Sequence, residues 1–240
     1  MKTSKGKSHA VLSLGTHLPR CLTHVLFHCR MFENSEFNQD ISGWNTESAT
    51  TMRNMFEGAI FDQDISSWIT SSVTDMHDMF MDSQFNGEIA DWDVSSVTDF
   101  SSMFQNSMFN SEIGIWNIES AIYLDNMFQD SPFNQYIGSW DVLLVEDFHD
   151  MFKGSSFNQD ISEWFPAAAT NMGEMFEDAT DFNQDLCAWS GFLVSRDVNV
   201  TMMFDGTACP DTSDPDTAAD PVTPLCYVCN PGMCIFCPGC

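Results

Sequence analysis

One position of the sequence carries an acidic residue about every 24 residues, and a row of carboxylates could bind calcium, which prefers oxygen ligands. This row, here called the acidic column, consists of Asp40, Asp64, Glu88, Glu112, Asp160 and Asp185, with Tyr136 where one acid is missing. Neighbouring rungs of a parallel sheet lie about 4.8 Å apart, where two carboxylates repel by about 1 kcal/mol even in water. Calcium or a basic partner would offset the repulsion. The alternative is a solvent-exposed face whose repulsion is screened by salt.

The nine cysteines could form disulfides or hold zinc. Cys187 and Cys209 flank the last, irregular repeat, and a bridge between them would hold a cap closed, so we predict that disulfide. The tail, "CYVCNPGMCIFCPGC", contributes Cys226, Cys229, Cys234, Cys237 and Cys240. Zinc ribbons separate their two C-x-x-C pairs by about 15–20 residues, and here four residues separate them, which favours disulfides over zinc.

Catalytic motifs are missing from the sequence. His77 and His149 are the histidines inside the repeats, and neither has sequence neighbours that would complete a triad. The sequence also lacks a glycine-rich phosphate loop, an H-E-x-x-H motif and an EF-hand loop. It therefore predicts neither an enzyme nor a dedicated metal site. The alternative is a catalytic site in the cysteine-rich tail or in a further domain.

The elements that must position these residues are copies of one unit. Met-Phe pairs begin at positions 31, 55, 79, 103, 127, 151 and 175, and the tryptophans follow in step, with Trp189 one residue late. A strictly periodic set of large apolar side chains indicates that each unit buries the same groups against its neighbours. We therefore expect the Met, Phe, Ile and Trp side chains to form continuous columns in a core.

Each 24-residue unit has room for one short strand and one short helix. Val73, Met76 and Phe80 stand at i, i+3 and i+7, which predicts a helix of one to two turns with these side chains on one face. The stretch from Phe37 to Ile41 is too short for a second helix, and as a strand it places both residues on one side. The expected fold class is an α/β repeat, a leucine-rich-repeat-like right-handed solenoid with one short parallel strand and one short helix per coil.

Charge and hydropathy exclude two classes of partner. The chain has 35 acidic and 8 basic residues, and five of the bases precede residue 31. A surface this acidic repels phosphates, so we expect no nucleic acid partner. No run of about 18 apolar residues is present, which predicts no transmembrane segment. Residues 1–30 have a basic start and an interrupted apolar stretch, which fits a poor signal peptide or a mispredicted translation start.

Composition divides the chain into four segments. An irregular N-terminal segment, 1–30, precedes the repeat solenoid, 31–209, whose C-terminal cap is expected at about 186–209. Residues 210–225 are rich in Pro, Asp and Thr, which predicts an extended, poorly ordered linker. The cysteine-rich tail, 226–240, ends on a cysteine and is expected to be part of a longer module.

The repeated phrases "FNQDISGW", "FDQDISSW" and "FNQDISEW", joined by "SSVTDM" and "MF", resemble the repeats of the BspA-like leucine-rich-repeat surface proteins over about residues 31–209. The resemblance implies a solenoid, an extracellular or cell-surface location, and an adhesive or ligand-binding role without catalytic residues. The chain departs from the pattern at "FPAAAT", at "DVLLVED" and at Tyr136, which makes the binding face non-uniform.

These features together predict a non-enzymatic cell-surface or secreted protein that binds a protein or glycan partner through the solenoid face, without a cofactor. Specificity would come from positions that vary between coils, such as Tyr136, Gly87 and Ser111. The alternative is a structural spacer stiffened by calcium along the acidic column.

Overall fold

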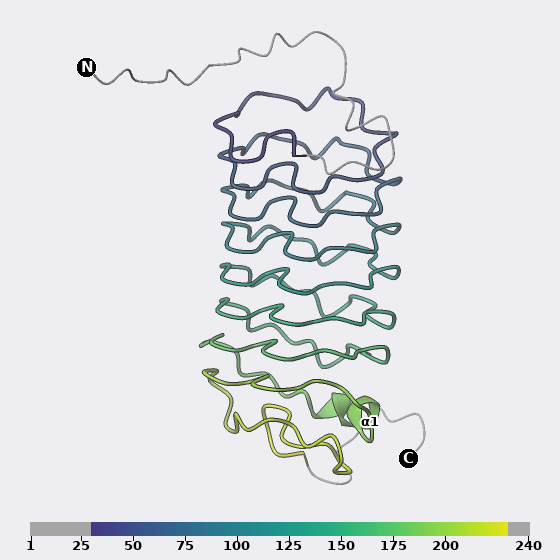
Figure 1. Ribbon diagram of the computed structural model, residues 1–240, viewed down its shortest axis with the longest axis vertical. Helices are drawn as coiled ribbons and strands as arrows, with labels where there is room; N and C mark the ends of the chain where they lie inside the picture. The colour runs from purple at the N-terminus through teal and green to yellow at the C-terminus, as the bar shows by residue number, and fades with distance from the viewer. Residues whose placement is uncertain (1–29, 230–240) are drawn as a thin grey trace, which may run out of the picture.

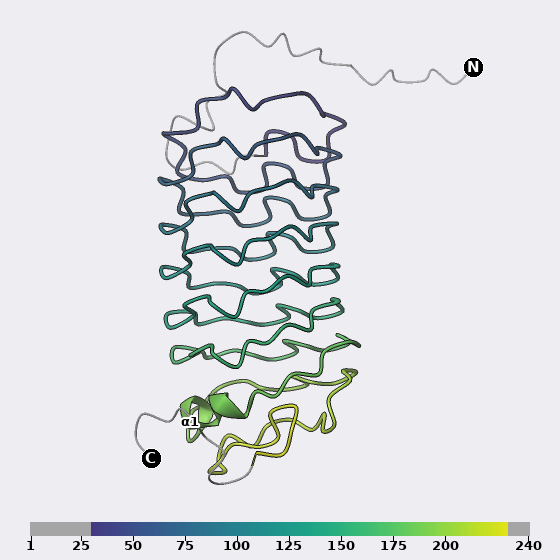
Figure 2. The same ribbon diagram turned by 180° about the vertical axis from the view of Figure 1, so that it is seen from behind.

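The computed structural model describes residues 30–229, in which the chain winds into coils that stack along one axis, as Figures 1 and 2 show. Strand pairing between these coils is limited to isolated parallel bridges between equivalent residues. The bridges form one continuous series: Thr51–Asp75, Asp75–Asp99, Asp99–Tyr123, Tyr123–Asp147, Asp147–Asn171 and Asn171–Asn199. The 24-residue spacing of the sequence is therefore the length of one coil. The handedness and the leucine-rich-repeat class stay predictions.

Helix in residues 30–229 is confined to the end of the stack, where η2 (Cys187–Trp189) runs into α1 (Ser190–Leu193). The segments predicted as helices within the coils are turns instead. In one of them, the N–H groups of Met76 and Phe80 donate to the carbonyl oxygens of Asp99 and Met103 in the next coil, both at 2.9 Å. An α-helix would need these N–H groups for carbonyls four residues earlier, so the bonds between coils exclude it.

The parallel bridges also lie in a different part of the coil from the predicted strand at Phe37–Ile41. Copies of that stretch are joined by asparagine side chains. Asn134 Oδ1 accepts a hydrogen bond from the backbone N–H of Asn158 at 2.9 Å and another from Gln159 Nε2 at 3.0 Å. A side-chain oxygen thus takes the role that a backbone carbonyl has in a β-ladder.

The core consists of aromatic columns that run along the stack. The rings of Trp68 and Trp92 lie 6.4 Å apart with an interplanar angle of 3°, and those of Phe56 and Phe80 lie 5.5 Å apart at 5°. The tryptophans from Trp68 to Trp189 are at most 4% exposed. The prediction of continuous apolar columns is therefore confirmed, and it holds because each coil places the same side chains above those of the coil before it.

The disulfides differ from the prediction. Cys187 pairs with Cys229, and Cys209 pairs with Cys226, so the predicted Cys187–Cys209 bridge is wrong. The chain after Cys209 folds back over the end of the stack and brings two tail cysteines to the last coil (Figure 1). Sequence spacing could not select between these pairings, since several cysteines were within reach of each other.

Residues 210–225 belong to this cap, contrary to the expected poorly ordered linker. Val222 and Leu225 are fully buried. The N–H of Val222 donates to Ser190 Oγ at 2.7 Å, and the carbonyl of Leu225 accepts from Leu186 N–H at 3.2 Å. The last coil of a stack exposes apolar side chains on its open end, and this segment covers them.

Some predictions fall on residues that the structure does not describe. Cys234, Cys237 and Cys240, like residues 1–29, lie outside the described range. Within residues 30–229, no helix has the length and apolar character needed to cross a membrane.

Candidate functional site

The members of the acidic column lie exposed on the surface, and its aspartates have a local structural role. Oδ1 of Asp40 and Oδ1 of Asp64 accept backbone hydrogen bonds of 2.9 Å from Ser42 and Ser66, and hydroxyl bonds of 2.7 Å from the same serines. These hydrogen bonds lower the pKa of both aspartates and fix the turn after them. The same backbone bond is made by Asp160 and Asp185.

The middle of the column has a different sequence. Glu88, Glu112 and Tyr136 replace Asp there, and the residues two positions later are Ala90, Gly114 and Gly138. Glu and Tyr side chains are too long to form the compact turn that Asp forms with its own backbone. Because Ala90 and Gly114 are smaller than the serine that most other coils have at this position, space is left at the surface, and a pocket of about 390 Å³ opens.

This pocket, here called the Tyr136 pocket, is formed by residues of three successive coils. Its lining consists of Ala90, Glu112, Gly114, Ile115, Gln135, Tyr136 and Ser139. Ile115 is 75% exposed and Tyr136 is 53% exposed. A Cβ atom at Gly138 would come within 2.6 Å of the backbone carbonyl oxygen of Asp160 and within 2.8 Å of the Tyr136 ring, so that position needs glycine. Apolar area beside one carboxylate and one phenol is a composition suited to binding.

The structure thus brings together only part of the predicted site. Glu112 and Tyr136 meet in the pocket, whereas Asp40, Asp64 and Asp185 remain separate turn-forming residues. Sequence reasoning missed Ile115 and Gly114. The signal that could have found them is the change from serine to glycine or alanine two residues after the column position in three successive coils.

A second polar surface follows the bridge series. His77 Nε2 lies 2.8 Å from Asp78 Oδ2, and His77 Nδ1 lies 3.7 Å from Asp99 Oδ1. Burial disfavours the charged ring, but pairing with Asp78 and Asp99 outweighs burial and raises the pKa of His77 to about 9. Arg53 Nη1 lies 3.6 Å from Asp99 Oδ2. His77 is therefore a charged member of an ion-pair network at neutral pH.

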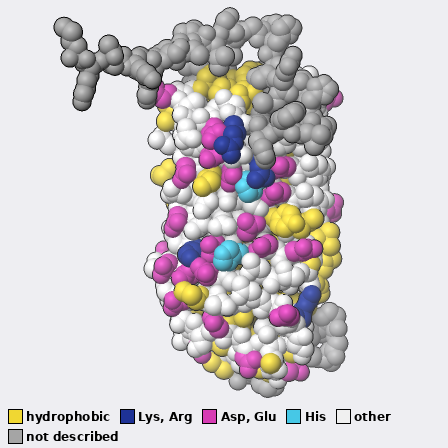
Figure 3. All heavy atoms as spheres, in the orientation of Figure 1, with side chains coloured by type: hydrophobic (Ala, Val, Ile, Leu, Met, Phe, Trp, Pro, Cys, Tyr) yellow, Lys and Arg dark blue, Asp and Glu magenta, His cyan; other side chains and the backbone are white. Residues whose placement is uncertain are grey.

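His149 lies three coils after His77, at the equivalent position of the repeat, and is also surrounded by acidic residues. Lys153 forms ion pairs with Glu174 and Glu177, and these contacts raise the pKa of Lys153. Burial raises the pKa of Asp150, which is 9% exposed. Figure 3 shows two histidines (cyan) on one face, each among acidic side chains (magenta) and near a Lys or Arg (dark blue). In the described part of the chain, His149, Asp150 and Glu174 form the one group of three side chains close enough to share a metal ion.

Comparison with known proteins gives a family. A family model described as "Mycoplasma protein of unknown function, DUF285" matches the chain twice, over residues 27–132 and 107–213. The two ranges overlap because a model that spans several repeats fits the stack in more than one register. Neither the curated proteins nor the solved structures contain a match.

Proposed function

The chain belongs to the family described as "Mycoplasma protein of unknown function, DUF285", and we propose that it is a non-enzymatic repeat protein that binds a protein or glycan partner through the Tyr136 pocket. The observation that carries the proposal is the combination of exposed Ile115 and Tyr136 with a concave surface, on a column that is otherwise acidic. Aromatic residues that are partly exposed in a pocket commonly anchor partners at binding sites.

The chemistry of the pocket favours a ligand with both an apolar face and polar groups. The rings of sugars and the side chains of many peptides have this character, and an aromatic ring can stack on either. Glu112 can accept hydrogen bonds from hydroxyl groups or pair with a basic group of the partner. The acidic surroundings would favour approach of a basic partner over an acidic one.

The finer family and location belong to the same proposal. The repeated "FNQDIS-W" phrase supports membership of the BspA-like leucine-rich-repeat proteins and a right-handed solenoid of that class. The pairs Cys187–Cys229 and Cys209–Cys226 support an extracellular or cell-surface location, because disulfides persist in oxidising compartments.

The test is a direct binding measurement with matched variants. Arrays of glycans and of extracellular-matrix proteins are probed with the full chain, and the dissociation constant of each ligand found is measured for wild type, Tyr136→Ala and Ile115→Ser. We expect each pocket variant to weaken binding about tenfold or more. Ile69→Ser is the control, since Ile69 is also exposed, at 48%, and is outside the pocket lining. Equal affinities for wild type and both pocket variants would rule out the Tyr136 pocket as the binding site.

A further inference from the structure

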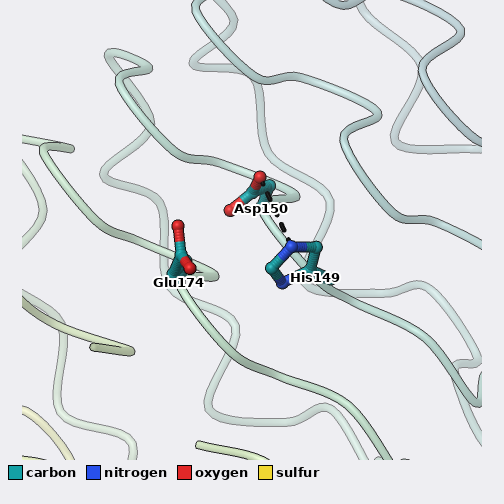
Figure 4. A group of neighbouring side chains, drawn as sticks. All are labelled: His149, Asp150 and Glu174. Carbon is teal, nitrogen blue, oxygen red and sulfur yellow. Dashed lines mark ion pairs between the residues drawn. The ribbon is translucent and has the colours of Figure 1, made fainter. Parts of the chain in front are cut away.

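The side chains of His149, Asp150 and Glu174 converge from two successive coils, as Figure 4 shows. One ligand atom from each residue lies within 4.8 Å of the corresponding atoms of the other two. His149 Nε2 and Asp150 Oδ2 are 3.6 Å apart, which is too long for a hydrogen bond. Two ligands that each lie about 2.0–2.2 Å from a tetrahedral metal ion are separated by about 3.3–3.6 Å, so this spacing fits a shared ion.

A backbone carbonyl selects which nitrogen of the neutral His149 ring can bind a metal ion. His149 Nδ1 lies 2.9 Å from the carbonyl oxygen of Gly173, and only a protonated Nδ1 can bond to that oxygen. In the neutral ring, Nε2 then carries the free lone pair, and Nε2 is the nitrogen that faces Asp150. Histidine ligands of metal ions typically donate their other N–H to a carbonyl or carboxylate in this way.

Asp150 provides an independent sign that a ligand belongs here. The residue is 9% exposed, and its Oδ1 is buried without a hydrogen-bond partner, since Lys153 Nζ, 3.7 Å away, is beyond hydrogen-bonding distance. Figure 4 shows Asp150 between His149 and Glu174, so that the carboxylate is aimed into the group. A buried carboxylate oxygen without a hydrogen bond is costly, and coordination to a cation would satisfy it.

Lys153 is the cation already near the group. Its Nζ is 3.7 Å from Asp150 Oδ1 and forms ion pairs with Glu174 and Glu177. One ammonium group faces three carboxylates, so negative charge remains for a divalent ion. Because Lys153 and a metal ion would share Glu174, the two cations compete, and this competition can be tested.

His77 shows what the same position looks like when its Nε2 is paired with a carboxylate. His77 Nε2 lies 2.8 Å from Asp78 Oδ2, at hydrogen-bonding distance, whereas the corresponding atoms of His149 and Asp150 are 3.6 Å apart. His77 Nε2 therefore carries a proton that it shares with Asp78, and it has no lone pair free for a metal ion. His77 thus serves as a control for His149, whose Nε2 makes no such hydrogen bond.

We propose that His149, Asp150 and Glu174 bind one divalent transition-metal ion of the zinc type, which links two successive coils. A set of one imidazole and two carboxylates suits zinc and its neighbours, whereas calcium and magnesium prefer oxygen ligands alone. Three protein ligands leave a fourth position for water or for a group of a partner. The proposal departs from the expectation from sequence that the chain has no metal site, and it does so at residues outside the acidic column.

The test is zinc binding by the full chain, measured by isothermal titration calorimetry after free thiols are capped with iodoacetamide. The variants are His149→Ala and Asp150→Asn, with His77→Ala as the control. Asn is chosen at 150 because the residue has φ 56°, a conformation that Asn tolerates. Even indirect supports of a metal ligand contribute about 10–100-fold to affinity, so loss of a ligand should weaken this site at least tenfold. Histidines in residues 1–29 are present in every variant and cancel in the comparison.

Lys153→Gln gives a second, opposite readout. Removal of the competing ammonium group should tighten zinc binding severalfold and leave the fold intact, because Lys153 is partly exposed and glutamine keeps most of its side-chain length. Zinc should also raise the Tm of wild type and of His77→Ala, and leave that of His149→Ala unchanged. The proposal is overturned if His149→Ala, Asp150→Asn and His77→Ala all retain the wild-type affinity and stoichiometry. It is equally overturned if His77→Ala loses the site or if Lys153→Gln binds zinc less tightly.

Discussion

The indole Nε1 of Trp116 donates a hydrogen bond of 3.0 Å to the carbonyl oxygen of Ile89, which lies one coil earlier in the chain. The same bond recurs along the stack, for example from Trp92 to Ile65 at 3.1 Å and from Trp140 to Ile113 at 3.2 Å. Tryptophan therefore contributes more than apolar volume to each coil. It adds a second hydrogen bond to an isoleucine carbonyl that already accepts a backbone N–H, and so fixes the register between neighbouring coils.

We expect Trp116→Phe to lower the free energy of unfolding by about 2–4 kcal/mol. Phenylalanine keeps an aromatic ring, but it removes one of the two hydrogen bonds that the Ile89 carbonyl accepts and creates a void. Urea denaturation followed by circular dichroism measures the loss. Trp44→Phe is the control, since Trp44 is only half-buried at the start of the stack, and its loss should be smaller. Equal losses of unfolding free energy in the two variants would show that the hydrogen bond to Ile89 does not contribute to stability.

Cys187 and Cys229 form one disulfide, so replacement of either residue by serine should lower the free energy of unfolding by about 2–5 kcal/mol. The double variant should lose no more than either single one. Peptide mapping by mass spectrometry without reduction identifies the pairs directly. A peptide that links Cys187 to Cys209 would contradict the structure and restore the pairing predicted from sequence.

The pairing of His77 predicts a loss of stability in mildly alkaline solution. Its folded-state pKa, about 9, is above the unfolded value of 6.5, so the charged form stabilises the fold. This contribution is fully present below pH 6.5 and is lost as the pH rises through about 9. We expect the free energy of unfolding to fall by about 1–3 kcal/mol between these two pH values, as measured by urea denaturation at each pH. His77→Gln should flatten that part of the pH profile, and an unchanged slope would argue against the ion pair.

Gly154 takes a backbone conformation that other residues rarely adopt. Its φ is 65°, and a Cβ atom at this position would collide with the Asp130 carboxylate. Gly154→Ala should therefore destabilise the protein by about 1–2 kcal/mol or more. Gly43→Ala is the control, because a Cβ atom at Gly43 has no atom within 4 Å. A thermal melt compares the two, and similar Tm values would show that the turn at Gly154 can adjust.

The calcium-stiffened spacer makes a separate prediction. The Oδ1 atoms of Asp40 and Asp64 are already used in local turns, and both side chains are exposed. We therefore expect millimolar calcium to leave the Tm unchanged, compared with sodium chloride at equal ionic strength. A rise in Tm that Asp64→Asn reduces would instead favour the spacer.

The spacing of apolar residues in the sequence was enough to predict which side chains of each repeat are buried. Val73, Met76 and Phe80 face the core as their spacing predicts, although they lie in turns rather than a helix. Burial follows from the 24-residue spacing of the apolar residues, which can be read directly from the sequence. The choice between helix and turn is different, because it depends on whether an N–H group bonds within its own coil or to the next one.

Only the tertiary structure decided which distant residues meet. The partner of Cys187 depends on how the segment after Cys209 folds over the open end of the stack, a contact between residues about 40 positions apart. The Tyr136 pocket is lined by residues of three successive coils. His149 and Glu174 come together because successive coils lie in register. The sequence therefore determined the repeat and its core, whereas contacts between coils decided the backbone conformation, the cap and the sites.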